Sequence, residues 1–318
     1  ELAAEYYDKI LFEDATFGDL LDRPGPVAIA TGTDISTGSR LAFYQNDFDL
    51  LCSDLEPVRL SRAAATSSAV PVVLSAVTFN NYGGTCGYQY PAWVRDVADP
   101  ENRARPAGRA VQRFREMQDF MNSEERPFIH LVDGGVADNL GVRGVLEALE
   151  EMGVSAAFRD EVGFGDIETI ILLVVNARSA PSTDWDRRES PPGFISQLLQ
   201  ASNVPIDRYS FETIELMRDR VEFSRWRREL KIAQARLAGA TEAEAQASVP
   251  KLNLHVLDIS FDRIQDPEQR AYFMNLPTSF VLPAEAVDRL REIAGRVMRE
   301  SVEYQSLLRA VDAKRVDH

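Results

Sequence analysis

Cysteine and histidine, which supply many metal ligands and catalytic groups, are scarce in this chain of 318 residues. Its two cysteines, Cys52 and Cys86, form no C-x-x-C pair and no Cys/His ligand spacing, which excludes the common zinc sites. The sequence leaves open whether these cysteines form a disulfide. Three histidines leave little room for catalysis that depends on histidine.

Glycine-rich phosphate-binding motifs are also missing. The chain has no G-x-G-x-x-G and no G-x-x-x-x-G-K-[ST] pattern, so nothing in it would hold the phosphates of a nucleotide. Asp133 and Asp138 lack the other oxygen ligands of a calcium loop. We therefore expect neither a cofactor nor a metal ion.

Positive charge is in the minority, with 35 basic against 50 acidic residues and a net charge of −15. A nucleic-acid-binding protein needs a dense basic face, so nucleic-acid partners are excluded. The same balance disfavours purely electrostatic attraction to a bilayer, and any lipid contact should be hydrophobic and made through a pocket. The longest apolar run, Ile170–Val175, is far shorter than the ~20 residues that span a membrane.

Apolar segments of strand and helix character alternate along the chain, which predicts an open α/β architecture. Residues 181–205, rich in proline and serine, should form a surface excursion before a long helix from Ile206 to about Ala238. The other expected elements are a strand at 27–30, a hairpin turn at Thr37-Gly38, a small-residue helix in 61–71, a strand ending before Asp133, a helix at 142–152, a strand at 169–177 buried on both faces, a strand at 252–256 and a closing helix at 284–297.

The segment Asp133-Gly134-Gly135 places a carboxylate at the end of an apolar strand, followed by two residues that tolerate positive φ. Ligands bind at the carboxyl ends of strands in open α/β sheets. Backbone N–H groups of the turn could keep this aspartate ionised, and it could then act as a general base. Judged from spacing alone, capping of the turn or of the following helix is the more frequent role of such a residue.

Three segments in this order resemble the patatin-like phospholipase family: Val27–Asp34 with the turn Ser36-Thr37-Gly38, Ser61–Pro71, and Asp133–Asn139. The resemblance is best over residues 26–178 and weaker to about residue 310. It implies a layered α/β sandwich with a mostly parallel central sheet and helices on both faces. One domain would span residues 1–318, with a helical excursion at 181–250 and a closing strand and helix at 251–318.

The resemblance also implies a serine activated directly by an aspartate, which cleaves the carboxylic ester of a phospholipid, lysophospholipid or other acylglycerol. Asp133 would be the proton acceptor, Gly134 and Gly135 would let the backbone turn, and Asn139 would order the turn through its amide. A Ser-Asp dyad needs no histidine. His130 should point to the opposite face of its strand, so a Ser-His-Asp triad is the poorer interpretation.

The chain departs from the family at the nucleophile, because residues 1–318 contain no Gly-x-Ser-x-Gly elbow. We interpret Ser36, Ser39, Ser67 and Ser68 as turn and packing residues. The family's elbow precedes the matched part and this chain opens without Met, so we expect a missing upstream segment and a chain that is inactive by itself. The alternative is a catalytically silent lipid-binding or interaction domain. The expected partner is a lipid or phospholipid substrate, and contact with a membrane surface would need no spanning segment. Acyl transfer instead of hydrolysis, the compartment and the oligomeric state remain open.

Overall fold

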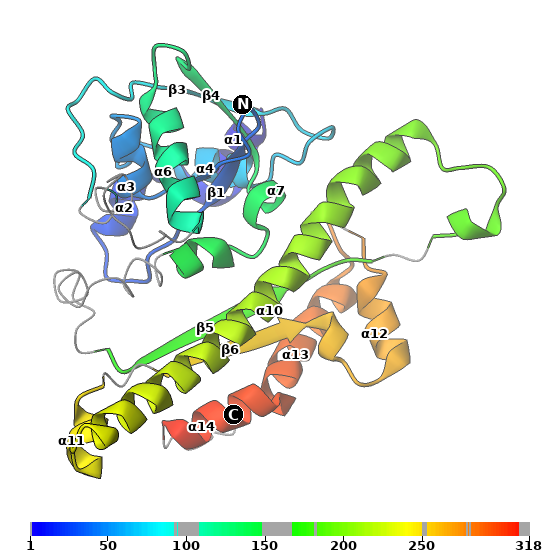
Figure 1. Ribbon diagram of the computed structural model, residues 1–318. Coiled ribbons are helices and arrows are strands. Elements are labelled where there is room, and N and C mark those ends of the chain that lie inside the picture. The colour runs from blue at the N-terminus through cyan, green and yellow to red at the C-terminus, as the bar shows by residue number, and fades with distance from the viewer. Residues whose placement is uncertain are drawn as a thin grey trace. The chain divides into compact units, whose positions relative to one another are not determined.

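The computed structural model describes residues 2–91, 94, 108–147, 167–180, 183–249, 253–277, 279 and 281–311 (Figure 1). The chain divides into two compact units. Residues 1–155 and 195–209 form the first unit, and residues 156–194 and 210–318 form the second. Whether both belong to one patatin-like domain stays a prediction, and each unit is described by itself below.

The first unit contains a four-stranded sheet in the order β2-β1-β4-β3. Every pairing in this sheet is antiparallel. Its strands are β1 (Thr31–Asp34), β2 (Arg40–Ala42), β3 (Val77–Asn80) and β4 (Phe128–Asp133). The helices of this unit are α1 (Leu2–Tyr7), the π-helix η1 (Asp8–Phe12), α2 (Phe17–Leu21), α3 (Gln45–Leu50), α4 (Leu60–Ser67), α6 (Gly108–Met121) and α7 (Gly135–Asp138).

The α/β class is confirmed, but the expected mostly parallel central sheet is wrong for the described residues. Parallel pairing occurs only between β5 (Thr169–Asn176) and β6 (Asn253–Ser260) of the second unit. The expectation failed because β1 and β2 are joined by a hairpin and β4 runs opposite to both of its neighbours, β1 and β3. The layering expected of a patatin-type sandwich stays a prediction.

Two local predictions in the first unit are confirmed. The Thr37-Gly38 turn joins β1 to β2, and Gly38 has the positive φ of 77° that favours glycine. The small residues of α4 pack closely on β1, since a Cβ added to Gly32 would lie 2.7 Å from Cγ2 of Thr66. A strand at 27–30 is wrong, because β1 begins only at Thr31 and the side chains of Val27 and Ile29 before it are exposed.

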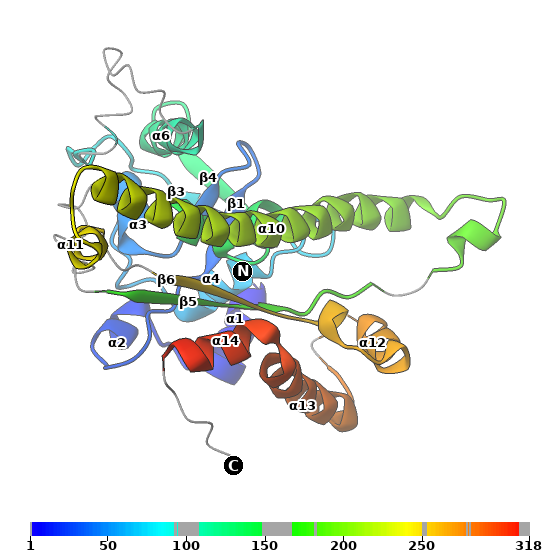
Figure 2. The same ribbon diagram turned by 60° about the horizontal axis from the view of Figure 1, so that its bottom comes forward.

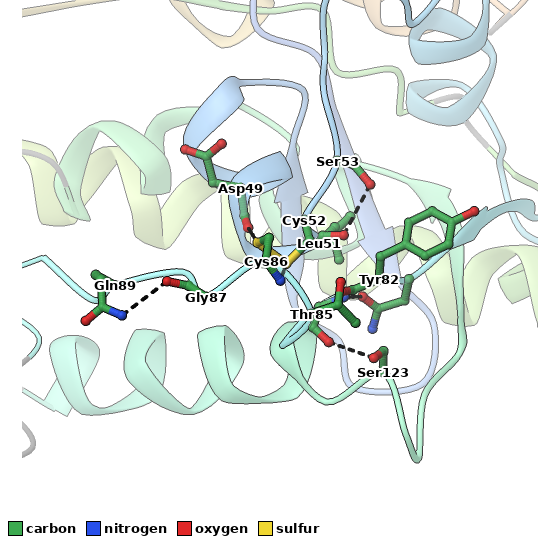
Figure 3. The surroundings of a disulfide bond; sticks show 12 residues. Asp49, Leu51, Cys52, Ser53, Tyr82, Thr85, Cys86, Gly87, Gln89 and Ser123 are labelled. Atoms are coloured by element: carbon green, nitrogen blue, oxygen red, sulfur yellow. Dashed lines mark hydrogen bonds between the residues drawn. A yellow bond between two sulfur atoms is a disulfide. The ribbon is translucent and has the colours of Figure 1, made fainter.

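The core of the first unit lies between the sheet, α3 and α6, and is rich in phenylalanine. Its buried members are Phe17, Leu41, Phe43, Phe48, Leu50, Leu51, Leu55, Ala63, Val94, Met117, Phe120, Ile129 and Leu131. A disulfide joins Cys52, which follows α3, to Cys86 in the loop after β3, with 5.6 Å between the two Cα atoms (Figure 3). The sequence alone left the pairing of these two cysteines undecided, and the structure pairs them.

The second unit packs helices on the β5–β6 pair. In Figures 1 and 2, α10 follows one side of this pair and α13 and α14 follow the other. One cluster of its core contains Ile259, Ile264, Phe273, Ile293 and Val297. Helix α10 (Phe194–Leu237) belongs to both units, with residues 195–209 in the first and residues 210–237 in the second. The other helices of this unit are the 3-10 helix η2 (Trp185–Arg187), α11 (Glu242–Ala247), the 3-10 helix η3 (Phe261–Arg263), α12 (Pro267–Met274), α13 (Ala284–Glu300) and α14 (Val302–Ala310).

Two sequence expectations for the second unit need correction. The long helix begins at Phe194, twelve residues before Ile206, and continues through Pro205. The predicted excursion is therefore helical from Phe194 onward. Strand β5 is also not buried on both faces, because alternate residues Ile171, Leu173 and Val175 are about half exposed. The closing helix α13 follows Pro283 as predicted.

Candidate active site

The candidate site is built on β4, the strand between β1 and β3 in the sheet of the first unit. Its side chains alternate between buried Ile129 and Leu131 and exposed Phe128 and His130, which fixes the register of the strand. Asp133 is its last residue and lies opposite Gly32 of β1. The sequence prediction of a carboxylate at the carboxyl end of an apolar strand agrees with this position.

One oxygen of the Asp133 carboxylate is fixed by the turn. Gly135 donates its backbone N–H to Oδ1 at 2.7 Å. The second oxygen accepts no hydrogen bond from any residue that the structure describes. Burial raises the pKa of the Asp133 carboxyl above its ordinary value, and the bond from Gly135 opposes this shift. Asp133 therefore has one oxygen held in place and one available to accept a proton.

A glycine is required at position 134 because the backbone of the turn lies close to β1 there, and not because φ is positive. Its φ is −60° and its ψ is −27°, values open to any residue, so the tolerance of glycine for positive φ is not used here. A Cβ at this position would lie 2.4 Å from Oγ1 of Thr31 and 2.5 Å from the Thr31 carbonyl oxygen. The absence of a side chain at Gly134 lets the turn pack directly against β1.

Gly135 and Asn139 pack around the same carboxylate. Gly135 is the first residue of α7, and positive φ is not observed there either. A Cβ added to it would lie 2.9 Å from Oδ1 of Asn139 and 3.0 Å from Oδ1 of Asp133. The Asn139 amide thus lies at the turn where the sequence prediction placed it, on the same side of Gly135 as the carboxylate.

Thr33 of β1 is a positioning residue that the sequence analysis missed. Its buried hydroxyl donates to the Asp133 carbonyl oxygen at 2.9 Å and accepts the N–H of Ala137 at 3.1 Å. It therefore joins the end of β4 to the start of α7. No local signal could have identified this residue, because Thr33 and Asp133 are 100 positions apart.

The second carboxylate of the motif, Asp138, has a structural role. Its Oδ2 accepts the backbone N–H groups of Arg143 at 2.9 Å and Gly144 at 3.4 Å. These residues lie at the start of a helical stretch that is described from 142 to 147, so Asp138 caps that helix. Burial raises the pKa of Asp138, but its bonded oxygen is committed to the helix end.

None of the serines that the sequence analysis considered donates a hydrogen bond to the Asp133 carboxylate within the described residues. Ser68 donates to the carbonyl oxygen of Ala64 at 2.9 Å and contacts the Tyr7 hydroxyl at 3.1 Å. Ser39 is buried in the hairpin and contacts the hydroxyl of Thr37 at 2.9 Å. These contacts are the turn and packing roles expected from sequence.

His130, the histidine of the first unit, has its hydrogen-bond partner on β3. His130 contacts the Thr78 hydroxyl through Nδ1 at 2.9 Å, across the β3–β4 pair, and His255 lies on β6 of the second unit. Among the described residues, no hydrogen bond joins a histidine to Asp133.

A cavity of about 690 Å³ lies in the second unit between α12 and α13, and Asp133 does not line it. Three arginines and three carboxylates are among its lining residues, which makes it a poor site for an acyl chain. Within the described ranges we find no cluster of three or more potential metal ligands. In the same ranges, no helix is both long and apolar enough to cross a bilayer.

The chain was compared with protein-family models, curated proteins and solved structures. It matches none of the three. The resemblance to patatin-like phospholipases therefore stays a prediction, and the candidate site depends on the geometry around Asp133.

Proposed function

We propose that this chain supplies the acid-base aspartate of a serine-dependent lipid acyl hydrolase. One observation carries the proposal: the half-buried Asp133 carboxylate ends the strand between β1 and β3, with Oδ1 held by Gly135 and Oδ2 without a hydrogen-bond partner in the described residues. A carboxyl group with a raised pKa is a stronger base than an ordinary aspartate, so it accepts a hydroxyl proton more readily.

In the proposed reaction, Asp133 takes the proton from a serine hydroxyl while the serine oxygen attacks the ester carbonyl carbon. The alcohol part of the lipid then leaves, taking the proton from Asp133, and an acyl-serine remains. Asp133 next removes a proton from water, which attacks the acyl carbon. The fatty acid is released as the serine oxygen leaves and takes that proton from Asp133, which restores both groups. Residues 1–318 contain no Gly-x-Ser-x-Gly segment, so the proposed nucleophile is a serine outside them.

The test is hydrolysis of a lysophospholipid and of a water-soluble nitrophenyl ester by the protein that carries this chain. Asp133→Asn keeps an oxygen for the Gly135 N–H but removes the base, and we expect kcat to fall by about a thousandfold. Asp138→Asn is the matched control, because it changes a neighbouring buried carboxylate that binds only backbone N–H groups in the described residues. We expect it to keep kcat within about threefold, since its charge lies outside the proposed chemistry.

Equal activity of the Asp133→Asn variant and the wild-type protein would contradict the proposal. A folded protein that hydrolyses neither ester would favour the alternative function, a catalytically silent lipid-binding or interaction domain. Transfer of the acyl group to an acceptor other than water would keep the role of Asp133 and change only the second step.

A further inference from the structure

The loop between α4 and β3 has both of its ends fixed to the strand that carries the proposed base. At the start of the loop, the carbonyl oxygen of Ala69 accepts the backbone N–H of Asp133 at 2.9 Å. After its end, Val77 pairs with Leu131, two residues before Asp133 on β4. Residues 70–76 therefore leave the end of β4 and return to it. We call these residues the valine loop.

The valine loop exposes apolar side chains and carries no charge. Val70, Val72 and Val73 are 36%, 54% and 64% exposed. Ser75 supplies the single hydroxyl group of the loop, whereas charged residues make up 27% of the whole chain. Single apolar residues scattered over a surface need no explanation, but neighbouring ones on one loop indicate a contact surface.

The backbone of the valine loop holds Val72 in a conformation that valine rarely adopts. Its φ is 76°, in the left-handed region, where a β-branched residue is an outlier. The N–H groups of Val73 and Leu74 close the turn around it by donating to the Val70 carbonyl oxygen at 3.2 Å and 2.9 Å. Glycine or asparagine would fit this turn with less strain. Strained residues of this kind cluster at active sites and in segments that hold ligands.

The polar groups around the valine loop lie at its two ends. Asp133 lies at the first end, and its Oδ2 accepts no hydrogen bond within the described ranges. Beyond the second end, Arg62 donates to the Thr78 carbonyl oxygen at 2.7 Å, and His130 contacts the Thr78 hydroxyl at 2.9 Å. In the part of the chain that the structure describes, no hydrogen bond or ion pair joins a charged side chain to residues 70–76. The surface next to the proposed base is therefore apolar.

We propose that the valine loop contacts the fatty acyl chain of the ester substrate, and that Val72 and Val73 set a preference for long acyl chains. This inference rests on the proposed function, which brings the ester carbonyl to Asp133. The acyl chain is attached to that carbonyl carbon, so its first methylenes lie beside the reacting atoms. A charged lipid headgroup needs charged or hydrogen-bonding partners that the loop does not offer. A hydrocarbon chain needs only apolar surface, and each methylene that leaves water strengthens its binding.

The test measures how ester hydrolysis by the protein that carries this chain depends on acyl length. Nitrophenyl acetate and nitrophenyl decanoate share a leaving group and differ only in the acyl chain. The variant combines Val72→Asn and Val73→Asn, because asparagine is polar and tolerates the left-handed conformation. The matched control is Phe128→Thr, which changes an exposed apolar residue at the other end of β4, about 17 Å along the strand from Asp133.

We expect the wild-type protein to have the higher kcat/KM for the decanoate ester. The double variant should lower the ratio of the two kcat/KM values about tenfold. Its kcat/KM for the acetate ester should stay within about threefold of wild type, because the base is unchanged. Phe128→Thr should keep the ratio within about twofold. The urea midpoint of the double variant should be at least that of wild type, because asparagine relieves the strain at Val72.

A second readout needs no nucleophile: the binding of decanoate and of butyrate, measured by isothermal titration calorimetry. We expect the wild-type protein to bind decanoate more tightly than butyrate. The double variant should bind decanoate about threefold to tenfold more weakly than wild type. If neither ester is hydrolysed but decanoate binding is weakened in this way, the proposed function fails and the acyl contact stands.

Three results would overturn the acyl contact. The first is an unchanged kcat/KM ratio, or unchanged decanoate binding, in the folded double variant, and hydrolysis of both esters would then leave the proposed function standing. The second is equal binding of decanoate and butyrate by the wild-type protein. The third is a double variant that is clearly less stable than wild type, or that loses a dimer seen in analytical ultracentrifugation, because another protein surface would then cover the valine loop.

Discussion

At the scale of single residues, Asp133 pairs a chemical advantage with a cost in stability. Burial raises its pKa in the folded state, so the ionised carboxylate destabilises the fold above that pKa. Between the unfolded and folded pKa values the folded state binds more protons, and the unfavourable contribution disappears as the pH falls through this range.

We therefore predict that Asp133→Asn is at least as stable as wild type near pH 7. Its advantage should shrink as the pH falls toward about 4, where the aspartate becomes protonated in both states. The asparagine oxygen can still accept the Gly135 N–H. Urea midpoints of both proteins across this pH range check the prediction, and a clear loss of stability in the variant near pH 7 would contradict it.

Gly134→Ala should destabilise the first unit by about 1–3 kcal/mol, because the new methyl group would meet the Thr31 backbone and side chain. Gly25→Ala is the control, since nothing lies within 4 Å of its added Cβ, and it should change stability by about 0.5 kcal/mol or less. Urea unfolding of both variants gives the comparison. Equal stability of Gly134→Ala and wild type would show that the turn can move away from β1.

The position of the aspartate at the end of a strand could be predicted from the sequence, but the close contact of Gly134 with β1 could not. A strand that ends in Asp133 is a local pattern and is visible in the residues themselves. The contact of Gly134 with Thr31 and the hydroxyl bond from Thr33 depend on β1 lying beside β4. Such long-range neighbours leave no mark in a single sequence.

At the scale of elements, the β1–β2 hairpin depends on the fully buried Asp34. Its carboxylate accepts the Ser36 N–H at 3.0 Å and the Thr37 hydroxyl at 2.9 Å, and it also pairs with Arg126. These bonds organise the turn and join it to the segment before β4. Removing one partner of a buried pair leaves the other charge without compensation.

Asp34→Ala should accordingly destabilise the protein by about 3–5 kcal/mol. The comparison is Asp184→Ala, which breaks the exposed pair with Arg188 and should change stability by about 0.5 kcal/mol or less. Chemical denaturation measures both effects. Similar small losses in the two variants would mean that the hairpin does not depend on Asp34.

The Cys52–Cys86 disulfide closes a loop with a sequence separation of 34 residues. By limiting the unfolded chain, a loop of this size stabilises a protein by about 2–4 kcal/mol. We predict that Cys52→Ser combined with Cys86→Ser lowers the unfolding free energy by this amount. Wild type and variant should coincide when both are measured under a reducing agent. Equal stability under oxidising conditions would show that the bond is absent or without effect.

Elements that depend on nearby residues could be predicted from the sequence. Elements that depend on strand pairing or on contacts with distant segments could not. The Thr37-Gly38 turn, the small-residue helix α4 and the closing helix α13 all follow from nearby residues. The antiparallel order of the first sheet follows from contacts such as that of Gly32 with Asp133. The start of α10 at Phe194 was missed because the helix was expected to begin only after Pro205.

At the scale of the whole molecule, the proposed ester hydrolysis needs a serine nucleophile in addition to the groups around Asp133. The first unit contains the proposed base and the residues that position it. The α/β class could be predicted from alternating apolar patterns. The division into two units could not, because it depends on contacts between distant segments.

The most direct test is labelling with a fluorophosphonate, which reacts with activated serines, in the protein that carries this chain. Intact mass and peptide mapping locate the adduct, and Asp133→Asn is treated in parallel. The account predicts an adduct on a Gly-x-Ser-x-Gly serine outside residues 1–318, formed much more slowly in the variant. An adduct on a serine within residues 1–318, equal labelling of both proteins, or no labelling of the folded protein would contradict it.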